Sequence, residues 1–260
     1  MLSRQHMTIP VKLLFLAVLF CSFPRITCAA DQEIGDAYAD ILSDLEEETP
    51  AVRVADPLYY WNKGMYHVND RLYFWLMKPV ATGYKKVTPD PVRNGIKNFF
   101  SNLMAPVRFV NCILQGKSEK AGVELGRFMV NTTVGLGGFW SPADKEPSLR
   151  KVSEEDFGQT LAVYGVGNGF YLVWPVIGPS TLRDTAAMGF DNVIAPGPYL
   201  LSPMPYLDTE ITSLSMWTVD KVNALSFRLG DYETLKGAAI EPYEAFRDAY
   251  IQNREKKIRE

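Results

Sequence analysis

The sequence predicts a mostly helical protein with little β-structure. Apolar side chains recur three and four positions apart over several long stretches, the spacing that places them on one face of an α-helix. Strand-like segments are limited to a few short pieces around Leu161–Val176. A length of 260 residues is compatible with one large domain or two small ones, and it is enough to bury a core.

The first 30 residues have the layout of a secretory signal peptide. Arg4 and Lys12 provide the positive charge, Val11–Phe23 is apolar, and small residues at Cys28–Asp31 resemble a cleavage site. The apolar run is too short for a comfortable membrane span, and a single signal-anchor helix is the alternative. We therefore predict that the protein is exported.

Cys28 raises a second possibility for the processed N-terminus. A lipoprotein signal ends in a cysteine that becomes the lipidated first residue, usually after a Leu-small-small triplet. Here Arg25-Ile26-Thr27 precedes the cysteine and matches that triplet poorly. We therefore expect cleavage after Ala30, with lipidation at Cys28 as the alternative.

Export changes the charge balance of the chain. Three of the 27 basic residues and none of the 30 acidic residues precede residue 31, so 24 basic and 30 acidic side chains remain, a net charge of −6. No Lys/Arg cluster forms a stripe that could follow a phosphate backbone, which excludes nucleic-acid binding. Residues 31–54 are predicted to be an acidic tether, either disordered or containing a short amphipathic helix.

An aromatic helix is predicted over Asp56–Met77, opened by Asp56 as N-cap and Pro57 in the first turn. Tyr59, Tyr66 and Tyr73 share one face of it, whereas its two tryptophans lie elsewhere. Amphipathic rings favour the membrane–water interface, so a helix lying in that layer is one interpretation, and a helix buried on most sides is the other. The predicted interfacial contacts are Tyr59, Trp61, Tyr73, Phe74 and Trp75.

Two further helices follow. The first, over residues 94–116, has an apolar stripe, with a kink expected at Pro106 and an end at Gly116. The second is capped by Ser118 and contains Gly122 and Gly126, whose spacing weakly suggests close approach of another helix.

The second half of the chain alternates loops and helices. Glycine-rich loops are predicted at 135–142 and 165–170, and prolines exclude regular helix over 193–207. A helix is expected from about Asp208. The last helix starts near Glu241-Pro242 and is expected to fray into a solvated charged tail over residues 254–260.

The exported chain offers little catalytic or metal-binding chemistry. It contains one histidine, His67, and one cysteine, Cys112, which is too few for a His/Cys metal site and allows no intramolecular disulfide. A serine hydrolase would have to use His67, and no G-x-S-x-G elbow accompanies it. The triplet Asp156-Phe157-Gly158 spells a kinase motif without its partner motifs. We predict no enzyme activity, no cofactor and no metal.

Four ordered blocks of sequence resemble the MlaA (VacJ) family of outer-membrane proteins. They are DPLYYWNKGMYHVNDRLYFWLMKPVATGYKKVTPDPVRNGIKNFFSNL, LQGK with GRFMVNTTVGLGGFWSPA, EDFGQTLAVYGVGNGFYLVWPVIGPSTLRD and PYEAFRDAYIQNRE. The resemblance covers roughly residues 55–253. It implies a ring-shaped, nearly all-helical monotopic protein, embedded in the inner leaflet of the Gram-negative outer membrane, with glycine- and proline-rich loops around a central amphipathic channel.

The resemblance also implies a function and partners. Phospholipids mislocalised to the outer leaflet would pass through the channel to a soluble periplasmic carrier, beside a trimeric porin, so that the lipid asymmetry of the outer membrane is maintained. A membrane-associated phospholipase and a structural porin scaffold are the alternatives. The candidate channel and gating residues are Met65, Tyr66, His67, Val68, Asn69, Leu136, Phe139, Trp140, Arg183 and Asp184. For Arg183 and Asp184, an ion pair inside the protein is an equal alternative to a polar rim.

Overall fold

The computed structural model describes residues 54–196 and 209–260, and side chains from residue 214 onward in the second range. The predicted signal peptide, Cys28 and all but the last residue of the acidic tether lie outside these ranges. So do most of the prolines between residues 193 and 207. The chain is mostly helical in both ranges, as predicted.

The helices are α3 (Tyr59–Leu72), α4 (Lys78–Val87), α5 (Asp90–Leu114), α6 (Ser118–Thr133), α7 (Phe157–Val163), α8 (Leu182–Ile194), α10 (Thr209–Phe227), α11 (Asp231–Ala238) and α12 (Pro242–Arg259). A π-helical turn, η1 (Tyr73–Met77), joins α3 to α4. Two short 3₁₀ turns, η2 (Pro142–Lys145) and η3 (Pro147–Leu149), follow α6. Strands β1 (Tyr171–Trp174) and β2 (Gly178–Thr181) form an antiparallel hairpin in which Tyr171 is opposite Thr181.

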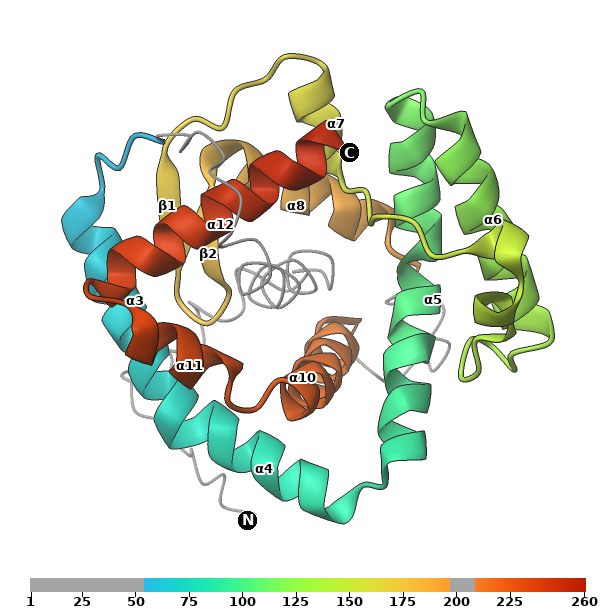
Figure 1. Cartoon of the computed structure of the whole chain (residues 1–260), viewed down its shortest axis with the longest axis horizontal. Helices are drawn as coiled ribbons and strands as arrows, with labels where there is room; N and C mark the ends of the chain where they lie inside the picture. The colour runs from blue at the N-terminus through green and yellow to red at the C-terminus, as the bar shows by residue number, and fades with distance from the viewer. Residues whose placement is uncertain (1–53, 197–208) are drawn as a thin grey trace, which may run out of the picture.

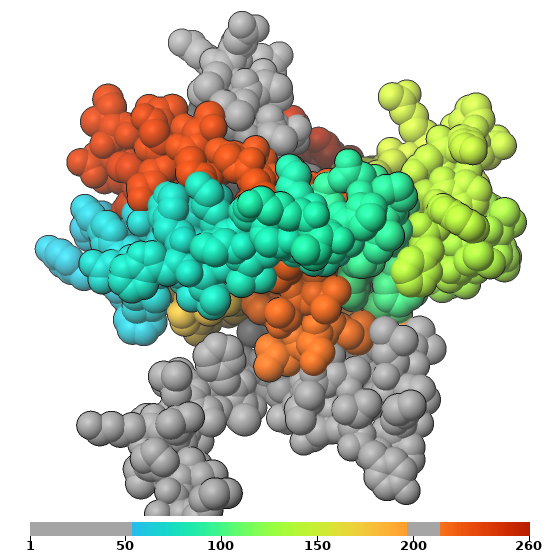
Figure 2. Space-filling view, turned by 90° about the horizontal axis from the view of Figure 1, so that it is seen from below, coloured from blue at the N-terminus to red at the C-terminus, as the bar shows by residue number. Residues whose placement is uncertain are grey.

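These elements are arranged as a ring (Figure 1). In this view α3, α4 and α5 run along the left, the bottom and the right of the ring, α7 and α8 follow at the top, and the hairpin with α12 returns to α3. Helix α6 packs outside α5, whereas α10 lies on the inner side of α4 and α5. In Figure 2, α10 and α11 with α12 lie on opposite sides of the band made by α3 and α4. The predicted ring-shaped, mostly helical fold is confirmed.

Helix α3 begins later than predicted, at Tyr59 with Leu58 as the cap residue. Asp56 is not the N-cap because its carboxylate is used elsewhere. It accepts a hydrogen bond from Nδ2 of Asn62 at 2.7 Å and another from the hydroxyl of Tyr243 at 2.5 Å. Asp56 therefore ties the start of α3 to α12, which is a tertiary role that a local capping pattern does not reveal.

Helices α5 and α6 differ from the prediction in detail. Helix α5 continues through Pro106, and Gly116 follows its end with the positive φ of 73° expected of a glycine at that position. Ser118 is the first residue of α6 and does not cap it. A Cβ at Gly126 would meet the side chain of Leu149 in η3 at 2.7 Å, whereas Gly122 faces open space. The close approach at Gly126 is therefore to a 3₁₀ turn and not to another helix.

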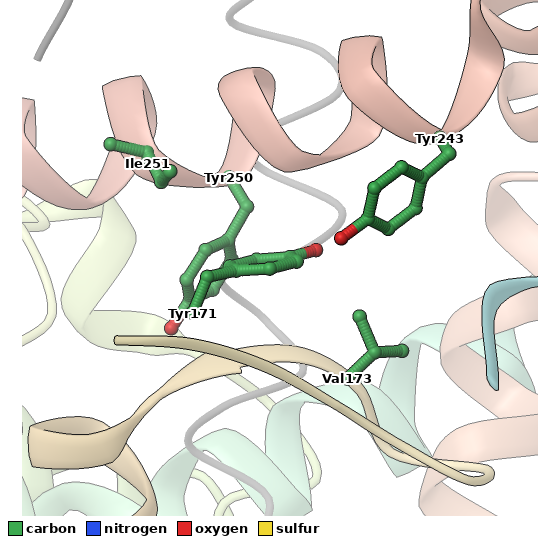
Figure 3. Packing of buried hydrophobic residues seen from close by; sticks show 5 residues of the cluster. All are labelled: Tyr171, Val173, Tyr243, Tyr250 and Ile251. Atoms are coloured by element: carbon green, nitrogen blue, oxygen red, sulfur yellow. The ribbon is translucent and has the colours of Figure 1, made fainter. Parts of the chain in front are cut away.

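The largest apolar cluster lies where the hairpin meets α12 (Figure 3). It contains Tyr171, Val173, Tyr243, Tyr250 and Ile251. Tyrosine rings meet edge-on or tilted across it, with centroids of Tyr171 and Tyr250 6.3 Å apart. Such aromatic pairs contribute beyond the area that they bury. The cluster fixes the hairpin against the C-terminal helix.

Asn62 attaches the same hairpin to α3. Its side chain is fully buried; Nδ2 donates to the carbonyl of Tyr171 at 3.0 Å and Oδ1 accepts from the amide of Val173 at 2.8 Å. These bonds occupy the outward backbone groups of β1, which would otherwise be an open strand edge. A buried asparagine thus replaces a third strand.

We expect Asn62→Ala to destabilise the fold by about 2–4 kcal/mol, because it leaves the buried amide of Val173 unpaired. Urea unfolding in detergent solution measures the effect. Arg71→Ala, which removes an exposed side chain two turns further along the helix, is the control and should change the unfolding free energy by less than about 0.5 kcal/mol. Equal effects of the two substitutions would contradict this role of Asn62.

Candidate functional site

Asn69 holds the turn of the hairpin. Its Nδ2 donates to the carbonyl of Trp174 at 2.8 Å, and its Oδ1 accepts from the amide of Val176 at 2.7 Å. Val176 has a φ of 71°, which is unfavourable for a β-branched residue and persists only where the surroundings hold it. One side chain of α3 therefore fixes a strained turn that connects β1 to β2.

The other residues of the predicted gating segment point in different directions. Met65 and Tyr66 are half-buried against the apolar cluster, whereas His67 and Val68 are exposed. Among the residues that the structure describes, the ring of His67 contacts one other aromatic ring, that of Tyr66, with centroids 5.3 Å apart. Within this segment, Asn69 is the residue whose side chain forms hydrogen bonds to the hairpin.

The glycine-rich loop after α6 carries exposed apolar side chains. Leu136, Phe139 and Trp140 are exposed, and Phe139 stacks on Phe99 of α5 at 4.9 Å. Leu136 has a φ of 53°, in the left-handed region that few leucines adopt. A Cβ at Gly138 would clash with Asn102, so the loop lies directly on α5.

The predicted interfacial aromatics divide into two groups. Trp61 and Trp75 are exposed, the latter at 80%. Tyr73 is instead buried, and its hydroxyl donates to Glu233 at 2.7 Å. Tyr59 packs on the apolar cluster, and Phe74 lies half-buried beside Tyr232. For Tyr73 the interfacial prediction is wrong, because its side chain is buried and α11 covers it.

Arg183 and Asp184 do not form a polar rim. Both side chains are buried and belong to an ion-pair network inside the protein. At its centre, Arg254 of α12 donates to both oxygens of Asp156 at 2.6 and 2.7 Å and to Asp184 at 3.0 and 3.1 Å. Tyr250 donates to Asp184 as well, at 3.0 Å. We call Arg183, Asp156, Asp184, Tyr250 and Arg254 the closing joint, because it connects α12 to α7 and α8.

The closing joint explains the triplet Asp156-Phe157-Gly158. Asp156 caps α7, accepting the amide of Gln159 at 2.8 Å, and also binds Arg254. Phe157 stacks on Phe190 of α8 at 3.8 Å. A Cβ at Gly158 would clash with the guanidinium of Arg254 and the carboxylate of Asp184, so only glycine fits.

The prediction that the last helix frays from Arg254 is wrong. Helix α12 continues to Arg259, and Arg254 is only 3% exposed. The signal was present in the sequence, because Arg254 extends the stripe of Phe246 and Tyr250 at a spacing of four. An arginine on a buried face requires a buried acid as partner.

The electrostatics of the joint follow from burial and from its two guanidinium groups. Burial alone would raise the pKa of Asp184, but Arg254 and Arg183 outweigh it and hold that pKa below the usual range of an aspartate. Asp191 lies nearby without a guanidinium bound to it. Burial and the negative charge of Asp156 raise the pKa of Asp191 to about 7, although the amide of Phe157 and the side chain of Asn111 donate to it.

Within residues 54–196 and 209–260, no group of three His, Cys, Asp or Glu side chains is placed to hold a metal ion. Cys112 is fully buried, and burial raises the pKa of its thiol to about 11. No helix in the same ranges is both long enough and apolar enough to cross a bilayer.

The fold and the joint together make this chain a ring-shaped, mostly helical protein that is closed by buried charges. A family model described as MlaA lipoprotein matches residues 54–257. The chain therefore belongs to the MlaA family.

Several relatives agree with that assignment. The chain is 36% identical over 203 residues to the intermembrane phospholipid transport system lipoprotein MlaA of Escherichia coli, covering 76% of each chain. It is 33% identical to the Haemophilus influenzae protein of the same name, covering 78% of this chain and 79% of that one. An uncharacterised Rickettsia conorii protein is 33% identical over 248 residues, covering 95% of this chain and 94% of that one.

A solved structure also matches. It is described as the structural basis for maintenance of bacterial outer membrane lipid asymmetry, and it is 32% identical with a TM-score of 0.68. The match covers 78% of this chain and 99% of that chain.

We predict that Gly158→Ala destabilises the protein by about 2–4 kcal/mol, because a Cβ at this position forces Arg254 away from its carboxylates. Gly189→Ala in α8 is the matched control, since nothing lies within 4 Å of its Cβ position. That control should be neutral or stabilise by up to about 1 kcal/mol through helix propensity. Unfolding midpoints in detergent separate the two, and a harmless Gly158→Ala would refute the steric role.

We further predict that Asp191 makes stability depend on pH. Its pKa is higher in the folded state than in the unfolded chain, so the folded state retains a proton that the unfolded state loses. The contribution of protonated Asp191 to the free energy of unfolding is fully present below about pH 4. It is lost as the pH rises to about 7, by up to about 1.4 kcal/mol per pH unit. Unfolding free energies at pH 5 and 7 should therefore differ less in Asp191→Asn than in the unsubstituted protein. Identical pH slopes would exclude this titration.

Proposed function

We propose that this protein is the outer-membrane component of a retrograde phospholipid transport system. It takes phospholipids mislocalised to the outer leaflet and passes them to a soluble periplasmic carrier, which maintains lipid asymmetry. The observation that carries the proposal is the ring itself, in a chain that matches the MlaA model over residues 54–257. Relatives that it matches are named as lipoproteins of the intermembrane phospholipid transport system.

The proposed route is an amphipathic channel through the ring. The ring sits in the inner leaflet and faces the periplasm, beside a trimeric porin. Transport is passive, because the described residues contain no nucleotide-binding motif and directionality then comes from partners and from the lipid gradient.

The hairpin is the proposed gating element of this channel. Asn69 supports that role because it fixes the turn at Val176, and its two hydrogen bonds are the attachment of that turn to α3. Release of Asn69 would free a turn that is already strained. Leu136, Phe139 and Trp140 are proposed to lie near the channel as well, whereas Arg183 and Asp184 stabilise the ring that surrounds it.

The alternatives are a membrane-associated phospholipase and a structural porin scaffold. The phospholipase is disfavoured by the position of His67. Its side chain is exposed, and within residues 54–196 and 209–260 no hydrogen bond connects it to a serine or an acid. A purely structural scaffold predicts a different result. Substitutions in the hairpin that leave the protein folded would not affect a scaffold.

The decisive experiment measures outer-leaflet phospholipid and its lyso-products in cells lacking the protein and in cells given it back. We expect intact phospholipid to accumulate on deletion and to clear on re-expression without lysolipid. Clearance that generates lysolipid and is abolished by His67→Ala would establish the phospholipase. If deletion changes neither the phospholipid nor the lysolipid, the structural scaffold is the remaining interpretation.

Asn69→Ala tests the gate in the same cells. It removes two hydrogen bonds, worth about 1–3 kcal/mol, from the turn while Asn62 still holds β1. We expect more outer-leaflet phospholipid than in wild-type cells at equal protein level, because a passive conduit left open lets the leaflets equilibrate. Wild-type phospholipid with a folded Asn69→Ala protein would contradict the gating role.

A further inference from the structure

Helix α11 is bound to the α3–α4 helix on both sides of the π turn η1. The first attachment precedes the turn. Asp70, near the end of α3, accepts hydrogen bonds from the hydroxyl of Tyr232 at 2.8 Å and from Nζ of Lys236 at 2.6 Å, and both donors belong to α11. Nζ of Lys236 also lies 5.0 Å from the ring centroid of Phe74, within the turn. These contacts fix α11 to α3.

The second attachment lies in the turn and beyond it. Glu233 of α11 accepts a hydrogen bond from the hydroxyl of Tyr73 at 2.7 Å and forms an ion pair with Lys78, the first residue of α4. Nζ of Lys78 lies 5.7 Å from the ring centroid of Phe74. On each side of the contact, one acid, one tyrosine and one lysine take part. Helix α11 therefore bridges from α3 to α4 across the turn.

The attachment of α11 is polar and reversible. In α11, which the structure describes in full, no residue is buried. The ring of Tyr232 packs on those of Tyr73 and Phe246, with centroids 4.4 and 4.9 Å apart. Gly230 precedes the helix with a φ of 109°, and Gly237 lies in its last turn. Segments with few buried apolar contacts open at low free energy, and partly exposed ion pairs add little to hold them.

The π turn is the point at which the rim bends. The amide of Lys78 donates to the carbonyl of Tyr73, five positions earlier, whereas an α-helix joins residues four apart. Sharp kinks in helices occur at such turns. Figure 1 shows α3 along the left of the ring and α4 along the bottom, so the rim changes direction between them. The bridge made by α11 spans this bend.

The contacts of the other elements divide the ring into two halves. The hairpin half consists of α3, the hairpin, α7, α8 and α12. Asn62 and Asn69 bind the hairpin to α3, and the closing joint connects α12 to α7 and α8. The α10 half consists of α4, α5, α6 and α10. The hydroxyl of Tyr84 in α4 donates to Asn223 of α10 at 2.9 Å, and α6 packs on α5.

The described residues show two places where these halves meet. One is the π turn with α11. The other is the end of α5, where Asn111 donates to Asp191 of α8 at 2.9 Å and Gln115 donates to Thr160 of α7 at 3.1 Å. Two bodies joined at two places can pivot about the line through both. Such a pivot changes the distance between the hairpin and α10, because they belong to different halves.

We propose that α11 is a splint that locks the angle between the two halves, and that its release lets them pivot about the π turn. The covalent chain and the closing joint stay intact during this motion. A hinge of this kind needs a few residues that absorb the change in backbone angles, which the π turn supplies. The proposal concerns the conformation of the ring and does not rest on its transport of lipid.

The test measures distances between two nitroxide labels by double electron–electron resonance, on full-length protein in detergent. One pair joins the halves, with Pro175→Cys in the hairpin turn and Val219→Cys in α10, both at exposed positions. A second pair lies within the hairpin half, with Val68→Cys in α3 and Pro175→Cys. Cys112 is buried, which protects it from labelling.

Lys78→Glu should detach α11 from α4, because it places two carboxylates opposite each other. We expect the distance distribution of the pair that joins the halves to become at least about twofold wider, while the pair within one half is unchanged. Glu233→Lys should act in the same way. The double variant Lys78→Glu with Glu233→Lys restores an ion pair and should restore the narrow distribution. Asp248→Asn, which breaks the ion pair with Arg247 on α12, is the control and should change neither pair.

Three results would overturn the proposal. A narrow distribution between the halves in both single variants would show that the π turn is rigid without α11. A wide distribution that persists in the double variant would show that this ion pair is not the lock. Equal widening of both label pairs would place the flexibility inside the hairpin half. All three are read without lipid or carrier, so they are separate from a failure of the proposed transport.

Discussion

The closing joint is the constraint on which the ring depends. Arg254 near the C-terminus must reach Asp156 at the start of α7 and Asp184 at the start of α8, residues 98 and 70 positions earlier. A ring of helices has no central core to hold it, so its closure requires specific long-range contacts. Removal of one partner from a buried pair costs about 3–5 kcal/mol, which makes the joint sensitive to single substitutions.

Buried polar side chains take the place of a disulfide framework in this fold. Cys112 is the single cysteine among the described residues and is buried. Two asparagines of α3, seven residues apart, attach both ends of the hairpin to that helix. Their spacing places them on one face, and both use the amide group to satisfy backbone donors and acceptors that lack a neighbouring strand.

The continuous helix made of α3, η1 and α4 has both a buried face and exposed faces. The face of α3 and α4 that bears Asn62, Asn69 and Tyr73 holds the hairpin and α11. Apolar side chains on other faces of the same helix, including Val68, Leu76 and Val80, are exposed. The π turn keeps the buried face in register. At a constant angle of about 100° per residue, Ala81 would point about 100° away from Asn62, and the extra residue of the turn brings its side chain back to the buried face. Such turns are often found at functional sites, and here the reason is geometric.

The sequence by itself determined what short-range patterns encode. Local sequence patterns predicted the helices that correspond to α3, α5, α6, α10 and α12, but not α7, α8 or α11. Gly116 marked the end of α5, and the loops at 135–142 and 165–170 followed from their glycines. The low count of histidine and cysteine bounded the chemistry. The prediction that Tyr59, Tyr66 and Tyr73 share one face was also correct, but the pattern did not show whether that face contacts lipid or protein.

The tertiary structure decided everything that depends on a distant partner. The sequence pattern predicted that Arg254 begins a solvated tail, because the aspartates that bind it lie in other blocks of the chain. Gly158 looked like part of a kinase-like triplet, because the guanidinium group that leaves no room for a Cβ at this position comes from α12. The π turn was invisible because helical periodicity assumes a constant turn per residue, and only burial on both sides of Tyr73–Met77 shows where that assumption fails.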